Sequence, residues 1–110
     1  MAPTTTVAPT TTVSESAGER NARESAASYL EYSAFSRSGL VEQLEYEGFT
    51  TAQAEYGTDA QNADWNEQAA LSAASYLEYS AFSRSGLVEQ LKYEGFTTAQ
   101  AEYGATAVGL

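Results

Sequence analysis

The sequence predicts an all-α protein built from two tandem three-helix units of helix-turn-helix type. The first observation is an internal repeat: residues 25–57 return as residues 72–104 with one difference, Glu45 in the first copy and Lys92 in the second. Such a repeat fixes the architecture, because each copy is one structural unit. The second observation is the helical spacing of apolar residues within each copy. The third is the glycine turn EGFT, which both copies contain.

The first two helices of the first unit can be placed from their capping residues. Ser16 and Glu19 have the spacing of a capping box, so we expect the first helix to begin there and to run to about Phe35. The second helix is expected to begin near Ser38, which can cap it. Gly48 is expected to end that helix with a positive φ, the conformation that glycine adopts most easily.

A short third helix completes the first unit, which we place at residues 16–57. It is expected over residues 51–56, with Gly57 as the residue that stops it. A polar connector over residues 58–63 then leads to the second unit.

The second unit is expected over residues 64–104 and begins with Asp64, a strong N-cap. Trp65 lies on the apolar face of the helix that follows and aligns with Gly18 of the first unit. We therefore expect Trp65 to be largely buried, in its own unit or against the first. The small residues over 105–110 are expected to form a frayed tail.

The N-terminal segment over residues 1–15 differs from the rest of the chain. It is rich in threonine and contains both prolines of the sequence, without helical spacing. Such a low-complexity segment is expected to be a disordered tether. It is consistent with a stalk between a membrane anchor and an exterior domain, and equally with a plain disordered terminus.

Composition excludes several classes of site. The 110 residues include no cysteine and no histidine, which excludes a disulfide, a thiol nucleophile, a histidine base and the usual zinc ligands. Fifteen acidic residues against five basic ones give a net charge of −10. This charge repels phosphate and favours a basic polypeptide as partner, although it is also explained by solubility alone.

The helix-turn-helix outline suggests DNA binding, but its residues do not. The third helix, where a recognition helix would lie, offers Gln53, Glu55 and Tyr56 and no basic side chain. Base and phosphate recognition relies on arginine and lysine. We therefore expect no nucleic-acid partner.

Pairs of nearby acids raise the possibility of acid–base catalysis. Glu45 with Glu47, and Glu89 with Glu94, are such pairs. A catalytic carboxylate needs a pocket and a perturbed pKa, whereas these residues are expected on outward, solvated helical faces. We expect no enzyme activity, no catalytic residue, no metal site and no cofactor.

The tyrosines indicate a binding surface more clearly than the acids do. Four of the eight tyrosines are predicted to lie away from the apolar faces, among acidic residues. Tyrosine provides a large contact area at low entropic cost, although packing between helices would also explain these positions. The candidate partner-binding residues are Tyr32, Glu42, Glu45, Tyr46, Tyr79, Glu89, Lys92 and Tyr93.

The combination of motifs resembles a known family. The second copy begins with the lead DWNEQA (residues 64–69), and both copies contain SYL, FSRSGLVEQL (residues 35–44 in the first) and EGFTTAQAEYG (residues 47–57 in the first). This pattern resembles the Ltp-type host cell surface-exposed lipoproteins and covers about residues 16–104.

The resemblance implies a function and a location. Prophage-encoded members of the family are implicated in superinfection exclusion, in which a lipid-anchored protein on the extracellular face of the cell membrane stops an incoming phage from delivering its DNA. The implied partner is the phage tail tape-measure protein.

The resemblance also implies a lipobox cysteine, which this chain lacks, and no run of apolar residues is long enough to span a membrane. We therefore expect a mature or trimmed form whose membrane contact depends on an anchor absent from this chain; a protein without an anchor is the alternative. Two other functions stay open: a host exterior module that binds protein or envelope without a phage role, and an intracellular regulator of helix-turn-helix type.

Overall fold

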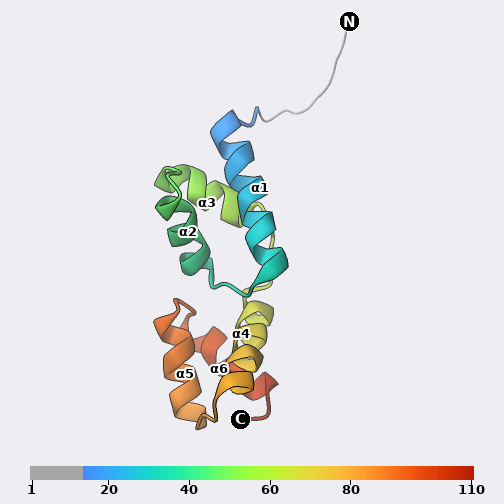
Figure 1. Cartoon of the computed structure of the whole chain (residues 1–110), viewed down its shortest axis with the longest axis vertical. Coiled ribbons are helices and arrows are strands. Elements are labelled where there is room, and N and C mark those ends of the chain that lie inside the picture. The colour runs from blue at the N-terminus through green and yellow to red at the C-terminus, as the bar shows by residue number, and fades with distance from the viewer. Residues whose placement is uncertain (1–13) are drawn as a thin grey trace, which may run out of the picture.

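The computed structural model describes residues 14–110, which form six α-helices and no strand (Figure 1). The helices are α1 (Ala17–Tyr32), α2 (Arg37–Tyr46), α3 (Thr51–Asp59), α4 (Trp65–Tyr79), α5 (Arg84–Tyr93) and α6 (Thr98–Ala107). The predicted all-α fold is confirmed. Of the tether predicted for residues 1–15, residues 1–13 lie outside the described residues.

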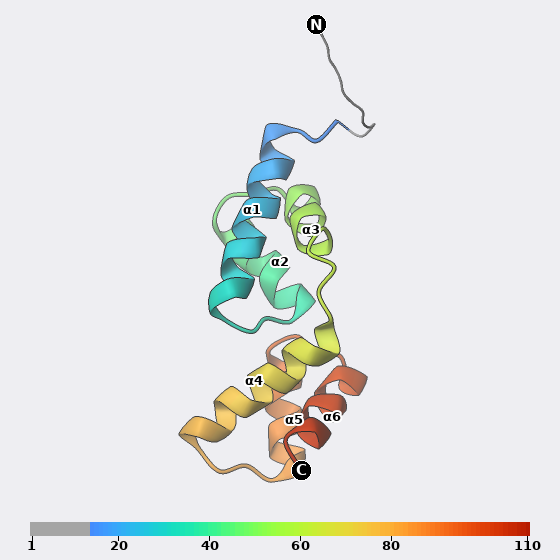
Figure 2. The ribbon, with the colours of Figure 1, turned by 90° about the vertical axis from the view of Figure 1, so that its right-hand side faces the viewer.

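The six helices form two three-helix units stacked end to end (Figures 1 and 2). In the first unit α1 packs mainly against α3, and α2 packs against α3; in the second unit α4, α6 and α5 repeat this arrangement. The stack measures 61 × 25 × 21 Å. The repeat in the sequence is therefore a repeat in space.

Each unit has a separate hydrophobic core. The buried residues of the first are Ala26, Leu40, Val41, Leu44 and Ala54. Those of the second are Ala69, Ala73, Leu87, Leu91, Phe96, Ala101 and Ala105. Burial of these side chains is the main favourable contribution to folding in each unit.

The first helix is shorter than expected, and Phe35 lies outside it. The helix ends at Tyr32. The ring of Phe35 instead packs edge-on against Tyr29, with 5.6 Å between ring centroids. Its backbone N–H donates to the side-chain oxygen of Gln68 in the second unit, at 3.0 Å. The prediction that α1 reaches Phe35 is therefore wrong.

The cap of the second helix is Ser36 rather than Ser38. The Ser36 hydroxyl accepts a hydrogen bond from the backbone N–H of Gly39 at 2.9 Å, and α2 begins at Arg37. Ser38 is left free for another contact, and its hydroxyl donates to the carbonyl oxygen of Gly95 in the second unit at 3.1 Å.

The third helix of the first unit runs through Gly57, which was expected to stop it. Gly57 lies inside α3, where this helix crosses α1. A Cβ atom at Gly57 would lie 2.6 Å from the carbonyl carbon and oxygen of Ala22. Gly104 is equivalent in α6, and its Cβ would lie 2.8 Å from the carbonyl oxygen of Ala69. These glycines therefore allow two helix backbones to approach closely, and they do not reverse the chain.

The C-terminal residues are packed rather than frayed. The last helix continues to Ala107, and Ala105 is fully buried in the second core. Val108 packs against the same core. The backbone N–H of Leu110 donates to the carbonyl oxygen of Ala105 at 2.9 Å. The small side chains let α6 lie close to α4, which the composition alone did not reveal.

The chain is fixed from Glu15 onward, within the segment that was expected to be a tether. Its carboxylate accepts two hydrogen bonds from Arg23, at 2.7 and 2.9 Å. It accepts a third from the hydroxyl of Tyr56 at 2.6 Å. These bonds, that from Arg23 first, lower the pKa of Glu15 to about 2. The contacts tie the start of α1 to α3.

Trp65 joins the two units. It begins α4, with Asp64 as the predicted N-cap. Its ring packs against the core of the first unit, together with Phe35 and Leu30. Most of the side chain is covered, as expected, and the surface that covers it belongs to the first unit. Trp65 lies at the boundary between units, where part of the ring meets water.

The junction also contains two hydrogen bonds between helix ends. The Ser36 hydroxyl donates to the carbonyl oxygen of Glu94 at 2.7 Å, beside the bond from Ser38 to Gly95. The positive end of the α2 dipole therefore faces the negative end of the α5 dipole, which is favourable. Among the described residues, extensive contacts between helices join helices of the same unit.

The two turn glycines should respond differently to substitution. Gly48 and Gly95 have φ values of 106° and 107°, as predicted. Gly48→Val should lower the free energy of unfolding by at least about 1 kcal/mol, because a β-branched residue disfavours this conformation; nothing lies within 4 Å of the added Cβ. Gly95→Val should cost more, because its Cβ would overlap the hydroxyls of Ser36 and Ser38. Urea unfolding of both variants checks this, and equal losses would contradict it.

Candidate functional site

The four candidate tyrosines all extend into solvent at the C-terminal ends of helices. Tyr32 ends α1 and Tyr79 ends α4, with 85% and 86% of their surface exposed. Tyr46 and Tyr93 end α2 and α5, at 88% and 87%. The alternative in which they pack between helices does not describe these four residues. Their role in binding stays a prediction.

The candidate charged residues differ between the copies. Glu42 and Glu89 are equivalent and both exposed. Glu45 is half-buried and accepts a hydrogen bond from the Thr51 hydroxyl. Lys92, its equivalent, is exposed and lies 3.6 Å from the carboxylate of Glu89. The one substitution between the copies therefore changes the local pairing as well as the charge.

A groove runs along the junction of the two units, and we call it the junction groove. It consists of two adjoining cavities of about 500 and 750 Å³, which share Ser33, Ala34, Tyr76 and Glu94 in their walls. The first unit contributes the end of α1 and part of α2. The second contributes the outer face of α4 and the end of α5. Neither unit forms this groove alone.

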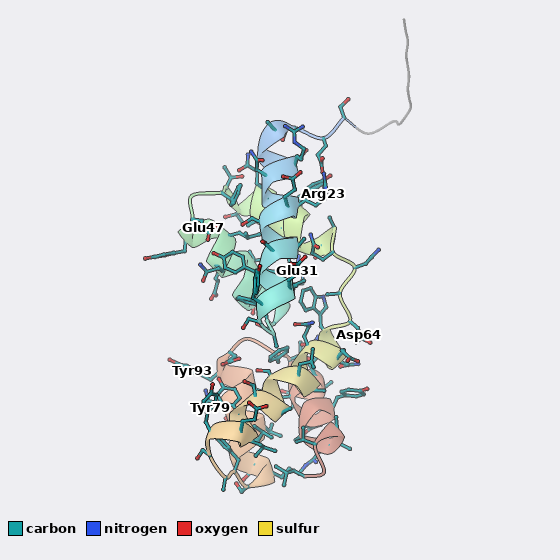
Figure 3. The ribbon with its side chains drawn as sticks, turned by 45° about the vertical axis from the view of Figure 1, so that its right-hand side comes forward. Arg23, Glu31, Glu47, Asp64, Tyr79 and Tyr93 are labelled. Carbon is teal, nitrogen blue, oxygen red and sulfur yellow. The ribbon has the colours of Figure 1, made fainter. Side chains whose placement is uncertain are left out.

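Three carboxylates and three exposed phenols line the junction groove. The carboxylates are Glu31, Glu42 and Glu94, and the phenols are those of Tyr32, Tyr79 and Tyr93. Figure 3 shows Tyr79 and Tyr93 on the same side of the second unit. Among the described residues that line the groove, none is lysine or arginine. The groove is therefore acidic and aromatic.

Glu94 is an exposed residue of the groove whose carboxylate is partly desolvated. Desolvation by burial raises its pKa, and a hydrogen bond from the Ser72 hydroxyl at 3.2 Å partly offsets this effect. Glu94 is therefore a surface acid, as the sequence predicts, and its carboxylate is partly desolvated in the groove. A cationic group in the groove would compensate this charge.

The structure separates the candidate residues into two groups. Tyr32, Glu42, Tyr79 and Tyr93 line the junction groove. Glu45, Tyr46, Glu89 and Lys92 do not line either of its cavities. Sequence reasoning missed Glu31 and did not select Glu94, because their place in the groove depends on how the two units stack. One sequence difference pointed to the junction: Trp65 stands near the start of the second unit at the position where the first unit has Gly18.

A smaller depression marks the equivalent face of the first unit. It measures about 270 Å³ and is lined by Ser25, Ser28, Tyr29 and Tyr32. The repeat-equivalent residues Ser72, Ser75, Tyr76 and Tyr79 line the junction groove. The same face is therefore open in the first unit and walled by a neighbouring unit in the second.

Residues 14–110 contain no cluster of acids that could hold a metal ion. None of the helices within this range is long and apolar enough to cross a membrane.

Comparison with known proteins identifies the family. The family model described as host cell surface-exposed lipoprotein matches residues 18–60 and again residues 64–108, one match for each unit. The chain belongs to this family. Its description places members at the host cell surface. No curated protein matches the chain.

A solved structure shares the fold. It is that of Ltp, a superinfection exclusion protein from the Streptococcus thermophilus temperate phage TP-J34. The TM-score is 0.76 at 24% sequence identity, over 83% of this chain and 95% of the other. The fold of this chain is therefore also that of an experimentally determined structure.

Proposed function

We propose that this protein is a surface-displayed superinfection-exclusion protein, which blocks phage DNA entry by binding a basic polypeptide of the incoming phage. The observation that carries the proposal is the family match, which covers both units. The similarity in fold to Ltp supports the same role. The tail tape-measure protein is the proposed partner, because it is the partner that the family resemblance implies.

The surface of the protein suits such a partner. A net charge of −10 attracts a basic polypeptide over a distance and raises its association rate. The exposed tyrosines offer contact area once the partner has arrived. An exposed protein at the cell surface can meet an incoming polypeptide before DNA transfer begins. We propose that an N-terminal lipid anchor holds the full-length protein there.

The functional test is display of the protein on a phage-sensitive host, with adsorption and DNA entry measured separately. Superinfection exclusion requires normal adsorption and reduced DNA entry. Reduced adsorption would instead favour a role in masking a receptor. If neither step changes, the protein is better explained as an exterior envelope-binding module without a phage role.

Binding to a purified tape-measure fragment should depend strongly on salt. The Debye length falls from about 10 Å at 0.1 M to about 3 Å at 1 M salt, so charge-driven association should weaken. Lys92→Glu should tighten binding and Glu45→Lys should weaken it, each by about two- to fivefold, because each substitution reverses a charge and so changes the net charge by two units. Duplex DNA is the control. Binding that ignores salt, or that prefers DNA, would contradict the proposed mechanism.

A further inference from the structure

We infer that the basic polypeptide binds in the junction groove, with a lysine or arginine side chain beside Glu94 and its neighbouring residues against the rim tyrosines. The inference rests on the proposed function. It adds one defined site per chain, made by both units together. The alternative that the repeat suggests is two equivalent sites, one on each unit.

The charges of the groove favour a cation. Glu31, Glu42 and Glu94 face the two cavities without a basic residue in the walls. The exposed carboxylate of Glu94 accepts a hydrogen bond from Ser72, and it forms no ion pair within the described residues. An ammonium or guanidinium group would form a charge-assisted hydrogen bond there, roughly twice as strong as a neutral one.

The tyrosines favour a polypeptide over a small cation. Tyr32, Tyr79 and Tyr93 surround the groove with 85–87% of their surface exposed. Aromatic faces attract cationic side chains, and their area suits the aliphatic stems of lysine and arginine. The two adjoining cavities lie along the junction, so a chain in extended conformation can pass over both of them.

The repeat supplies a matched control for three of the groove residues. Glu42, Tyr93 and Glu94 line the groove, whereas their equivalents Glu89, Tyr46 and Glu47 do not. In Figure 3 Glu47 lies on the first unit, away from the junction. Each pair has the same residue type and the same place in its own unit. A diffuse acidic surface would use both members of a pair equally, whereas the groove uses one.

The test is binding of a fluorescein-labelled dodecalysine peptide to the full chain and to matched variants. Glu94→Gln should weaken binding about tenfold, the size of one hydrogen bond to a charged group. Glu47→Gln should weaken it less than about twofold, as an exposed charge does. Tyr93→Ser should likewise lose more affinity than Tyr46→Ser. All four side chains lie on the surface, and circular dichroism confirms that each variant is folded.

Stoichiometry gives an independent readout. Calorimetric titration should find one peptide per chain. Two peptides per chain, equal losses within each matched pair, or no binding to the wild-type protein would each overturn the inference. The tape-measure fragment separates the two proposals. If the fragment fails to bind while the peptide follows the predicted pattern, binding in the groove is supported and the proposed partner is wrong. If the fragment binds and the matched pairs respond equally, the proposed partner is supported and binding in the groove is wrong.

Discussion

Gly57→Ala should destabilise the first unit by about 1–3 kcal/mol, the usual cost of overpacking. The added Cβ would lie 2.6 Å from the carbonyl carbon and oxygen of Ala22 and 2.8 Å from the backbone nitrogen of Arg23. These atoms belong to the backbone of α1 and cannot rotate away. Alanine gains about 1 kcal/mol over glycine in helix propensity, but α3 can keep that gain only by moving off α1.

The size of the units makes this cost decisive. A unit of roughly 40 residues without a disulfide or metal has only a few kcal/mol of stability. We therefore expect Gly57→Ala to melt the first unit well below the wild-type temperature, as measured by far-UV circular dichroism. Gly86→Ala is the control, because its Cβ would meet nothing nearer than the Ser83 hydroxyl at 3.0 Å. An increase in stability for Gly57→Ala would contradict the close-packing explanation.

Local features of the fold could be predicted from the sequence. The capping box at Ser16 is present as expected, and Asp64 caps α4. Both depend on residues within one turn of helix, so the sequence pattern contains the whole interaction. The positive φ of Gly48 and Gly95 is predictable for the same reason.

Features that depend on tertiary contacts could not be predicted in this way. Gly57 has the sequence appearance of a helix stop, and only the crossing of α1 and α3 shows that it is a packing residue. Phe35 lies outside the first helix, where its ring packs edge-on against Tyr29, and the equivalent Phe82 packs on Tyr76 after the end of α4. Packing against another part of the unit therefore outweighs a local preference at these positions.

The candidate site also combines features that local sequence predicts with features that depend on tertiary contacts. Exposure of Tyr32, Tyr46, Tyr79 and Tyr93 follows from helical spacing within each copy. The junction groove does not, because near-identical copies become unequal only when they stack. Their equivalence in sequence also hid the difference between Glu94 and Glu47.

Leu44→Ala and Leu91→Ala should each unfold one unit and leave the other folded. Both leucines are fully buried, Leu44 in the first core and Leu91 in the second. Truncation of a buried leucine costs about 2–5 kcal/mol, which exceeds or matches the stability of so small a unit. Since the two cores share no buried residue, the loss should remain within the substituted unit.

Hydrogen exchange read by mass spectrometry checks this for each unit separately. In Leu44→Ala, amides of α1, α2 and α3 should lose protection while those of α5 and α6 keep it; in Leu91→Ala the pattern should reverse. The control is Leu71→Ala, a leucine with 49% of its surface exposed, which should leave both units protected. The junction offers Trp65 and three hydrogen bonds, of which Ser36 and Ser38 supply two. If either core substitution removes protection from both units at once, those few contacts make the chain a single cooperative body, and separate folding of the units is wrong.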